Sequence, residues 1–172
     1  MAYEIERRFL VRGEAWRAHV RWQRRLQQGY LSASAEGFTT RVRCDGDGGA
    51  WLTLKCAASG QGPAVRHEFE YAIPEADAQA LLELAQAALC KRRFGLDLPG
   101  GDWVLDVFEG ANAPLVIAEV ELPAPDQAVV VPPWCVREIT GEGRFSNAAL
   151  ALLPLAAWPA SERSHQLEAW LA

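Results

Sequence analysis

Charged residues at alternate positions of short apolar segments are the feature of this sequence that most restricts its fold. Near the N-terminus, Glu4, Glu6 and Arg8 are two positions apart, and Ile5 and Phe9 occupy intervening positions. Successive side chains of a strand point to opposite faces, so a strand here has one charged face and one largely apolar face. Taken alone, the pattern is also typical of an exposed edge strand whose charges discourage aggregation. The rest of the chain decides between these interpretations.

The same one-sided pattern recurs in six later segments. Their charged sides carry Arg41, Arg43, Lys55, Arg66, Glu68, Glu70, Lys91, Arg93, Asp106, Glu119 and Glu121. A solvent-exposed sheet face normally mixes Thr, Ser and Gln with its charges, whereas ionisable groups dominate here and include both lysines of the chain. The opposite sides are apolar and can be covered by helices. This arrangement favours a closed barrel that is apolar outside and charged inside, and such a barrel can hold a small ligand.

The predicted elements are mostly strands joined by short loops. The expected strands are residues 3–12, 25–31, 38–44, 51–56, 65–71, 90–94, 103–109 and 115–122. A helix is expected to begin at Pro74, because apolar residues recur at spacings of three and four as far as Leu89. Shorter helices are expected after Ser146 and Ser161. The order predicts an α+β fold, an eight-stranded antiparallel β-barrel with a charged lumen and helices packed on the outside.

Composition restricts the class of protein further. We expect residues 1–172 to form a single domain, since this length buries a substantial core and no linker interrupts the pattern. The chain has no apolar run of about 18 residues and no apolar signal segment at its start, so a cytoplasmic protein without a membrane partner is expected. Its net charge of −5 argues against nucleic acid as a partner. A monomer and a homodimer both remain open.

A charged lumen has consequences for the ligand. Burying many charges is costly unless they are paired or bind a highly charged molecule. A triphosphate with a divalent metal ion offers both signs of charge. Arginine forks bind phosphoryl oxygens, and carboxylates bind Mg²⁺ or Mn²⁺, which prefer oxygen ligands.

Specific motifs support this interpretation. The segment Glu4-Ile-Glu6-Arg7-Arg8 resembles the ExExK signature of the CYTH proteins, also called triphosphate tunnel metalloenzymes. Further resembling segments are Gln28–Leu31, Arg41–Arg43, Leu52–Lys55, Arg66–Glu70, Lys91–Arg93, Leu105–Phe108, Ala118–Leu122, Pro132–Trp134, Glu138–Thr140 and Arg144–Asn147. The resemblance implies an eight-stranded antiparallel tunnel that holds a triphosphate and metal ions. Small bacterial members of this kind are most similar to inorganic triphosphatases.

The resemblance also implies roles for individual residues. The metal ligands would be Glu4, Glu6, Asp106, Glu119 and Glu121, with Glu138 or Glu68 as supporting groups. The residues that bind the triphosphate would be Arg8, Arg41, Arg43, Lys55, Arg66 and Arg93. The catalytic residues would be Lys91, Glu6 and Glu68.

One position departs from the signature, because Arg8 stands where the family pattern has Lys. A guanidinium keeps the positive charge but stays protonated and cannot act as a base. Lys91 is then the candidate that orients or deprotonates the attacking water, if crowding by Arg93 and Arg66 lowers its pKa. The alternative for Lys91 is a charge that only binds phosphate.

The expected function is hydrolysis of inorganic triphosphate to diphosphate and phosphate, with Mg²⁺ or Mn²⁺ as cofactor. Two alternatives use the same fold. One is an adenylate cyclase or a nucleoside or thiamine triphosphatase. The other is a non-catalytic module that binds triphosphate or polyphosphate, which the Arg8 substitution makes conceivable.

Overall fold

The computed structural model describes residues 3–33 and 38–171, with the side chains of 167–171 outside the description. The strands are β1 (Tyr3–Val11), β2 (Val20–Ser32), β3 (Thr39–Asp45), β4 (Ala50–Ala57), β5 (Val65–Ala72), β6 (Ala87–Leu96), β7 (Asp102–Phe108), β8 (Val116–Glu121) and β9 (Cys135–Glu138). The α-helices are α1 (Glu75–Leu84), α2 (Asn147–Leu152) and α3 (Ala160–Leu171). Among the described residues, no helix has the length and apolar character needed to cross a membrane.

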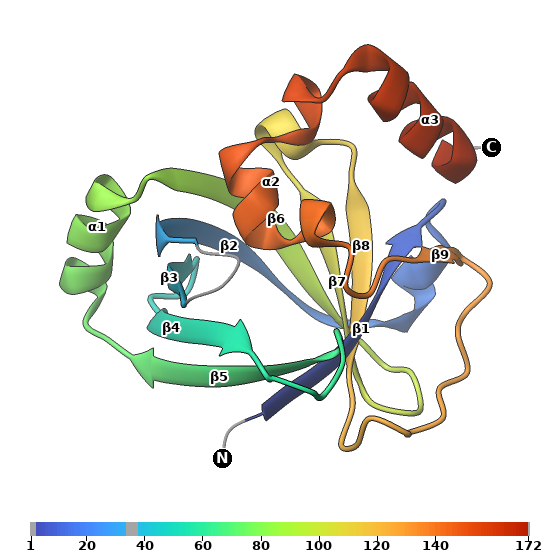
Figure 1. The fold of residues 1–172 in the computed structure, drawn as a ribbon, viewed down its shortest axis with the longest axis horizontal. Coiled ribbons are helices and arrows are strands. Elements are labelled where there is room, and N and C mark those ends of the chain that lie inside the picture. Colours follow the sequence, from blue (N-terminus) through green and yellow to red (C-terminus); the bar gives the residue numbers. More distant parts are fainter. Residues whose placement is uncertain (1–2, 34–37, 172) are drawn as a thin grey trace.

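Eight of the strands form a closed antiparallel barrel (Figure 1). Their order is β5-β4-β3-β2-β6-β7-β8-β1, and β1 closes the ring by pairing with β5. The short loops between consecutive strands produce this antiparallel order. The predicted eight-stranded barrel is confirmed, and β9 adds a ninth strand that pairs with the C-terminal part of β1.

The pairing register places the charged faces of the strands inside the barrel. Arg41 on β3 lies opposite Thr53 on β4, which in turn lies opposite Glu70 on β5. On the other side of the ring, Arg93 on β6 lies opposite Asp106 on β7. Residues directly opposite each other on neighbouring strands share a face. The one-sided charge pattern of the sequence therefore becomes the lining of the lumen.

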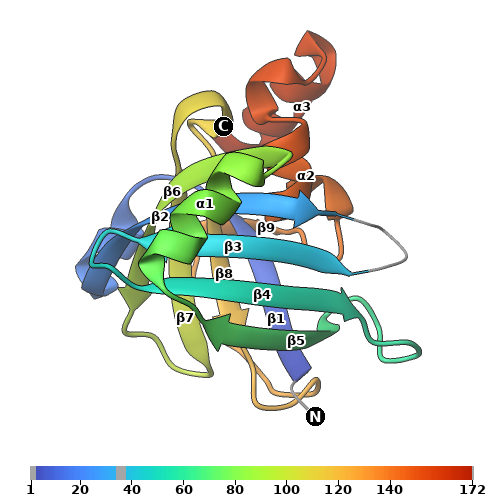
Figure 2. The same cartoon turned by 90° about the vertical axis from the view of Figure 1, so that its left-hand side faces the viewer.

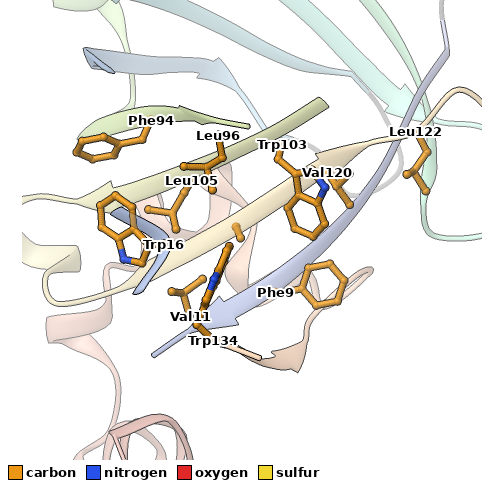
Figure 3. Packing of buried hydrophobic residues seen from close by; sticks show 11 residues of the cluster. Phe9, Val11, Trp16, Phe94, Leu96, Trp103, Leu105, Val120, Leu122 and Trp134 are labelled. Carbon is orange, nitrogen blue, oxygen red and sulfur yellow. The ribbon is translucent and has the colours of Figure 1, made fainter. Parts of the chain in front are cut away.

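Large aromatic side chains cover the outer faces of β1, β6, β7 and β8 (Figure 3). The rings of Phe9 and Trp103 are stacked with centroids 6.1 Å apart, and Trp134 meets Trp103 edge-on at 6.5 Å. Trp16, from a 3₁₀ helix at Ala15–His19, lies 4.9 Å from the ring of Phe94. This side of the barrel is thus sealed by a 3₁₀ helix and by the segment that contains Trp134.

The helix α1 covers another part of the barrel. Figure 2 shows it lying across the outer faces of β2, β3 and β4. Ala78 of α1 is fully buried there with Val42, and Cys44 and Ala50 complete the cluster. The apolar stripe of the helix and the apolar side of the strands cover each other, as the sequence predicts.

One end of the barrel is apolar on the inside and is covered by α2 (Figure 1). Leu10, Phe108 and Ile117 are two positions from the charged residues Arg8, Asp106 and Glu119 on their strands, so they also face inward. They pack with Phe145 and with Leu150 of α2, and all five are at most 2% exposed. The charged part of the lumen therefore stops where α2 begins. The sequence pattern did not separate these apolar positions from the charged ones beside them.

Several element boundaries differ from those predicted. The helix α1 ends at Leu84, because Ala85 is already extended, and Leu89 belongs to β6. The strand β2 begins at Val20, five residues earlier than predicted, since its first half is a largely exposed polar segment with little alternation. The helix α3 begins at Ala160, so Ser161 is not its cap. The cap of α2 is confirmed, because the Ala149 backbone N–H donates to Ser146 Oγ at 3.1 Å.

Candidate active site

A cavity of about 390 Å³ occupies the charged part of the lumen. All but two of the predicted ligand and catalytic residues line it, and the expected supporting residue Glu138 does not. The predicted residues in the lining are Glu4, Glu6, Arg8, Arg41, Arg43, Lys55, Arg66, Glu68, Arg93, Glu119 and Glu121. Six different strands contribute them, so the closed barrel is what brings residues far apart in the sequence together.

Four carboxylates crowd one side of the cavity, from the neighbouring strands β1 and β8. Glu6 lies opposite Glu121 in the strand pairing. Burial, and then the charges of Glu119 and Glu4, raise the pKa of Glu6 to about 7. Burial also raises the pKa of Glu121, and Glu4 and Asp102 add to the effect. Burial first, and then the neighbouring carboxylates, thus oppose ionisation of Glu6 and Glu121.

Two members of the same group are held ionised by cations. Burial alone raises the pKa of Glu119, but Arg93 and Arg8 outweigh it and hold that pKa well below its usual range. Burial acts in the same direction on Glu4, and Lys55 outweighs it and lowers the pKa. The Lys55 Nζ donates to Glu4 Oε2 at 2.6 Å and lies 3.2 Å from Glu68 Oε2. The carboxylates and the cations of the lumen are thus interleaved.

Arginines from β3 face the carboxylates of β5. The Nη2 atoms of Arg41 and Arg43 donate to Glu70, at 3.1–3.2 Å. Arg41 Nη2 also donates to Thr53 Oγ1 at 3.0 Å. Burial and the nearby Arg41 lower the pKa of Arg43 to about 10. Cationic groups thus crowd this side of the cavity as carboxylates crowd the other.

Several buried guanidinium N–H groups of the cavity have no hydrogen-bond partner in the described residues. They are Arg8 Nη2, Arg41 Nε and Arg43 Nε. Arg8 uses its Nε to donate to Glu119 at 3.1 Å and is only 7% exposed. An unsatisfied buried donor is costly, and the cost is greatest for a charged group. Arginine side chains also line the cavity, and guanidinium groups bind phosphoryl oxygens well.

The two remaining predicted ligand and catalytic residues, Lys91 and Asp106, do not line the cavity. Both are fully buried inside the barrel, opposite the apolar residues Phe108 and Ile117. Lys91 Nζ donates to Asp106 Oδ2 at 2.5 Å, and Arg93 donates to both oxygens of Asp106 at 2.8 Å. Burial lowers the pKa of Lys91 to about 8, although Asp106 opposes the shift. Burial raises the pKa of Asp106, but Arg93 and Lys91 outweigh it and lower that pKa. Asp106 thus holds two cations in place.

Glu138, expected as a supporting group, is distant from the cavity lining. Its carboxylate accepts hydrogen bonds from Arg7 at 2.9 and 2.7 Å, on the opposite face of β1 from Arg8. Residues that the sequence analysis did not assign to the site also line the cavity. They are Tyr30, Thr39, Glu70, Ser146, Asn147 and Ala148. Glu70 shares the alternate-position pattern of Glu68, which was a usable signal. Ser146 and Asn147 lie in the family-like segment Arg144–Asn147, but no role followed from it, because only the tertiary fold brings α2 to the lumen.

The carboxylates fit a divalent metal ion by their chemistry. As the side chains stand, no group of three or more potential ligands in residues 3–33 and 38–171 is arranged around a metal position. Glu4, Glu6, Glu119 and Glu121 nevertheless supply only oxygen donors, which Mg²⁺ and Mn²⁺ prefer. Burial and then the charges of Glu119 and Glu4 raise the pKa of Glu6, and a divalent cation beside it would favour its ionised form.

Comparison with known proteins agrees with this geometry. The CYTH domain matches residues 2–149. The chain belongs to the CYTH family. An inorganic triphosphatase of Acetivibrio thermocellus is 35% identical over 156 residues, which cover 90% of this chain and 96% of that protein. One of Nitrosomonas europaea is 35% identical over 157 residues, covering 87% and 97%. A crystal structure of an inorganic triphosphatase has a TM-score of 0.62 at 32% identity, covering 88% and 96%.

Membership of the CYTH family makes the position of Arg8 informative. Its backbone N–H donates to Thr140 Oγ1 at 3.0 Å, and its guanidinium reaches Glu119 and the cavity. The side chain at this position therefore supplies positive charge beside the carboxylates, as a lysine would. A guanidinium additionally leaves Nη2 free to donate in a second direction.

Proposed function

We propose that this CYTH protein hydrolyses inorganic triphosphate to diphosphate and phosphate, with Mg²⁺ or Mn²⁺ as its cofactor. Two relatives that are 35% identical are inorganic triphosphatases. The observation that carries the proposal is the cavity lining, in which Arg8, Arg41, Arg43, Lys55, Arg66 and Arg93 meet Glu4, Glu6, Glu119 and Glu121 inside one closed barrel. A compact polyanion with a divalent metal ion offers both signs of charge to this lining.

The cations bind and orient the substrate. Arg41 and Arg43 approach the cavity from β3, and Lys55 and Arg66 approach it from β4 and β5. Arg93 lies across the ring on β6, where its Nε and Nη2 donate to Asp106 and its Nη2 also donates to Glu119. Fixed cations on several sides hold the phosphate chain in one orientation, and this positioning is the main protein contribution to phosphoryl transfer.

The carboxylates of β1 and β8 would hold the metal. Glu4, Glu6, Glu119 and Glu121 are the proposed ligands. When bound, a divalent cation neutralises charge on the phosphate oxygens and on the leaving diphosphate. A water oxygen attacks the terminal phosphorus, the bridging P–O bond breaks, and the water proton passes to a base.

We assign the base to Glu68, which lines the cavity beside Lys55 and has a pKa raised by burial. Glu6, the other carboxylate expected to be catalytic, acts in this proposal as a metal ligand. Lys91 has no place in the cavity lining, so we propose that it acts indirectly, through Asp106 and Arg93.

A second candidate function is supported by an adjoining cavity of about 490 Å³. It shares Arg8 and Arg66 with the first cavity, and its other lining includes Pro63, Val65 and Leu152. An apolar space beside a phosphate site suits an organic group attached to a triphosphate. The alternative substrate class is therefore an organic triphosphate, such as a nucleoside or thiamine triphosphate.

A phosphate-release assay with Mg²⁺ or Mn²⁺ tests both candidates. Inorganic triphosphate, ATP and thiamine triphosphate are compared, and cyclic product is measured with ATP. We expect inorganic triphosphate to give the highest kcat/KM. Release from an organic triphosphate alone would replace the first candidate by the second. Tight binding of triphosphate without any release would indicate a non-catalytic binding module.

Two neighbouring arginines provide a matched pair of variants for this assay. Arg8→Gln removes a cation from the lumen, and we expect kcat/KM for inorganic triphosphate to fall roughly 10- to 100-fold, as for a lost hydrogen bond to a charged group. Arg7→Gln removes the same charge from the outer face, where Arg7 pairs with Glu138, and should leave kcat/KM unchanged. Equal effects of the two substitutions would remove Arg8 from the substrate site.

A further inference from the structure

Asn147, the first residue of α2, lies where the charged part of the lumen ends. Asn147 lines the charged cavity of about 390 Å³. Its neighbours Ser146, Ala148 and Ala149 line the adjoining cavity of about 490 Å³. Leu150, one helical turn further on, is fully buried among the apolar residues that fill this end of the barrel. Asn147 is thus a polar side chain at the boundary between the charged and the apolar lumen.

Lys91 fixes the orientation of the Asn147 side chain. Its Nζ donates to Asn147 Oδ1 at 3.0 Å. A lysine ammonium has only donors, so the amide must present its oxygen to Lys91 and its NH₂ group in the other direction. The fully buried Lys91 is itself fixed by Asp106 at 2.5 Å. Lys91 therefore holds the side-chain amide of Asn147 in one orientation.

The NH₂ group of Asn147 is available to a ligand. No hydrogen bond joins its Nδ2 to another residue in the part of the chain that the structure describes. Across the same cavity, Arg8 Nη2 is a buried donor without a partner. Beyond Asn147, the lumen is filled by the buried residues Leu10, Phe108 and Ile117, and the Nζ of the buried Lys91, opposite Phe108, already donates to Asp106 and Asn147.

We infer that Asn147 determines the length of phosphate chain that the lumen accepts. Its NH₂ group donates to the phosphate group at the α2 end of a bound triphosphate. The lumen beyond Asn147 is filled by buried side chains, so a fourth phosphate has no space at this end and moves the chain away from the Asn147 NH₂ group. Asn147 is thus a specificity-determining residue that favours triphosphate over longer chains. The inference rests on the proposed function, since it takes triphosphate as the ligand of the cavity.

The experiment compares inorganic triphosphate with inorganic tetraphosphate. Affinities are measured by titration calorimetry without metal, and kcat/KM values are measured with Mg²⁺ or Mn²⁺. For Asn147→Ala we expect the triphosphate-to-tetraphosphate ratio of affinities to fall roughly tenfold, as for one lost hydrogen bond to a charged group. The kcat/KM ratio should fall in parallel. An unchanged affinity ratio would overturn the inference.

A second variant separates binding of substrate from support of α2. Asn147→Asp keeps an oxygen for Lys91 but replaces the donor by a second acceptor oxygen. We expect its thermal unfolding temperature to be at least that of Asn147→Ala and its triphosphate affinity to be no higher. Recovery of wild-type triphosphate affinity by Asn147→Asp would show that Asn147 acts only through Lys91, which contradicts the inference.

Asn112 provides the matched control. It holds the other end of α2 from outside the lumen, because its Nδ2 donates to Leu150 O at 3.0 Å and its Oδ1 accepts from the Leu155 N–H at 2.9 Å. Asn112→Ala should lower stability but leave the triphosphate-to-tetraphosphate ratio unchanged. An equal change of that ratio in Asn112→Ala and Asn147→Ala would contradict the inference. The position of α2, and not the Asn147 amide, would then determine which phosphate chain length binds. A wild-type protein that binds triphosphate without releasing phosphate would contradict the proposed hydrolysis, while the affinity ratio would still test Asn147.

Discussion

At the scale of single residues, the carboxylate of Glu6 gives the clearest dependence on pH. Burial together with Glu119 and Glu4 raises its pKa from 4.5 to about 7. The folded protein therefore binds the Glu6 proton more tightly than the unfolded chain does. The associated stability is fully present below about pH 4.5 and is lost as the pH rises to about 7.

The substitution Glu6→Gln tests this sign. A neutral amide cannot ionise, so the variant gains stability relative to wild type as the pH rises through this range. With a chelator present, we expect the difference in unfolding free energy to shift by about 3 kcal/mol between pH 4 and pH 8. Urea unfolding at a series of pH values measures it. A difference independent of pH would show that Glu6 is not destabilised by its neighbours. Phosphate release by the same variant should fall by orders of magnitude, since a proposed metal ligand is lost.

Individual residues also show how far the sequence could predict the site. Alternation on strands was enough to place Glu4, Arg41 and Glu119 in one lumen, because a closed barrel has only one inner face. The same pattern could not show that Lys91 and Asp106 are fully buried. The burial of Lys91 and Asp106 depends on residues that are distant in the sequence. Asn147, which accepts a hydrogen bond from Lys91, lies 41 positions after Asp106.

At the scale of elements, the packing of α1 on β2 depends on Gly29. A Cβ atom at this position would lie 2.8 Å from Ala85 Cβ and 2.9 Å from Leu82 Cδ2. The helix would have to move away from the strand. We expect Gly29→Ala to lower the unfolding free energy by about 1–3 kcal/mol through overpacking. The control is Gly46→Ala, since nothing lies within 4 Å of a Cβ there. Equal unfolding midpoints for the two variants in urea would contradict this account of α1.

Some boundaries of the helices could be predicted from local sequence signals, and others could not. The cap at Ser146 and the stop before Pro154 are local signals, and α2 follows them. The end of α1 has no such signal. Leu89 continues the helical spacing by coincidence, but it faces the apolar end of the lumen from β6. Tertiary packing decides its conformation, and a pattern that extends over one segment contains no information about that packing.

At the scale of the whole molecule, the seam between β1 and β5 closes the barrel. Within residues 3–33 and 38–171 it has three Cα pairs, from Tyr3 to Ile5, whereas β2 and β6 share ten. Charged side chains reinforce this seam from the inside, because Lys55 of β4 bonds Glu4 of β1 and approaches Glu68 of β5. We therefore expect β1 and β5 to separate more easily than β2 and β6. A ligand in the lumen should stabilise the β1–β5 pairing most.

Amide hydrogen exchange tests this unequal closure. Local opening occurs where few contacts must be broken, so amides of residues 65–67 should exchange faster than those of residues 24–28 in the β2–β6 pairing. Adding inorganic triphosphate with a divalent metal should slow exchange at residues 65–67, because a polyanion in the lumen joins the cations of β3–β5 to the metal ligands of β1 and β8. Residues 24–28 serve as the internal control, since their pairing is already extensive. Uniform protection around the ring, or slowing confined to β2 and β6, would show that the charged groups of the lumen do not hold the barrel closed.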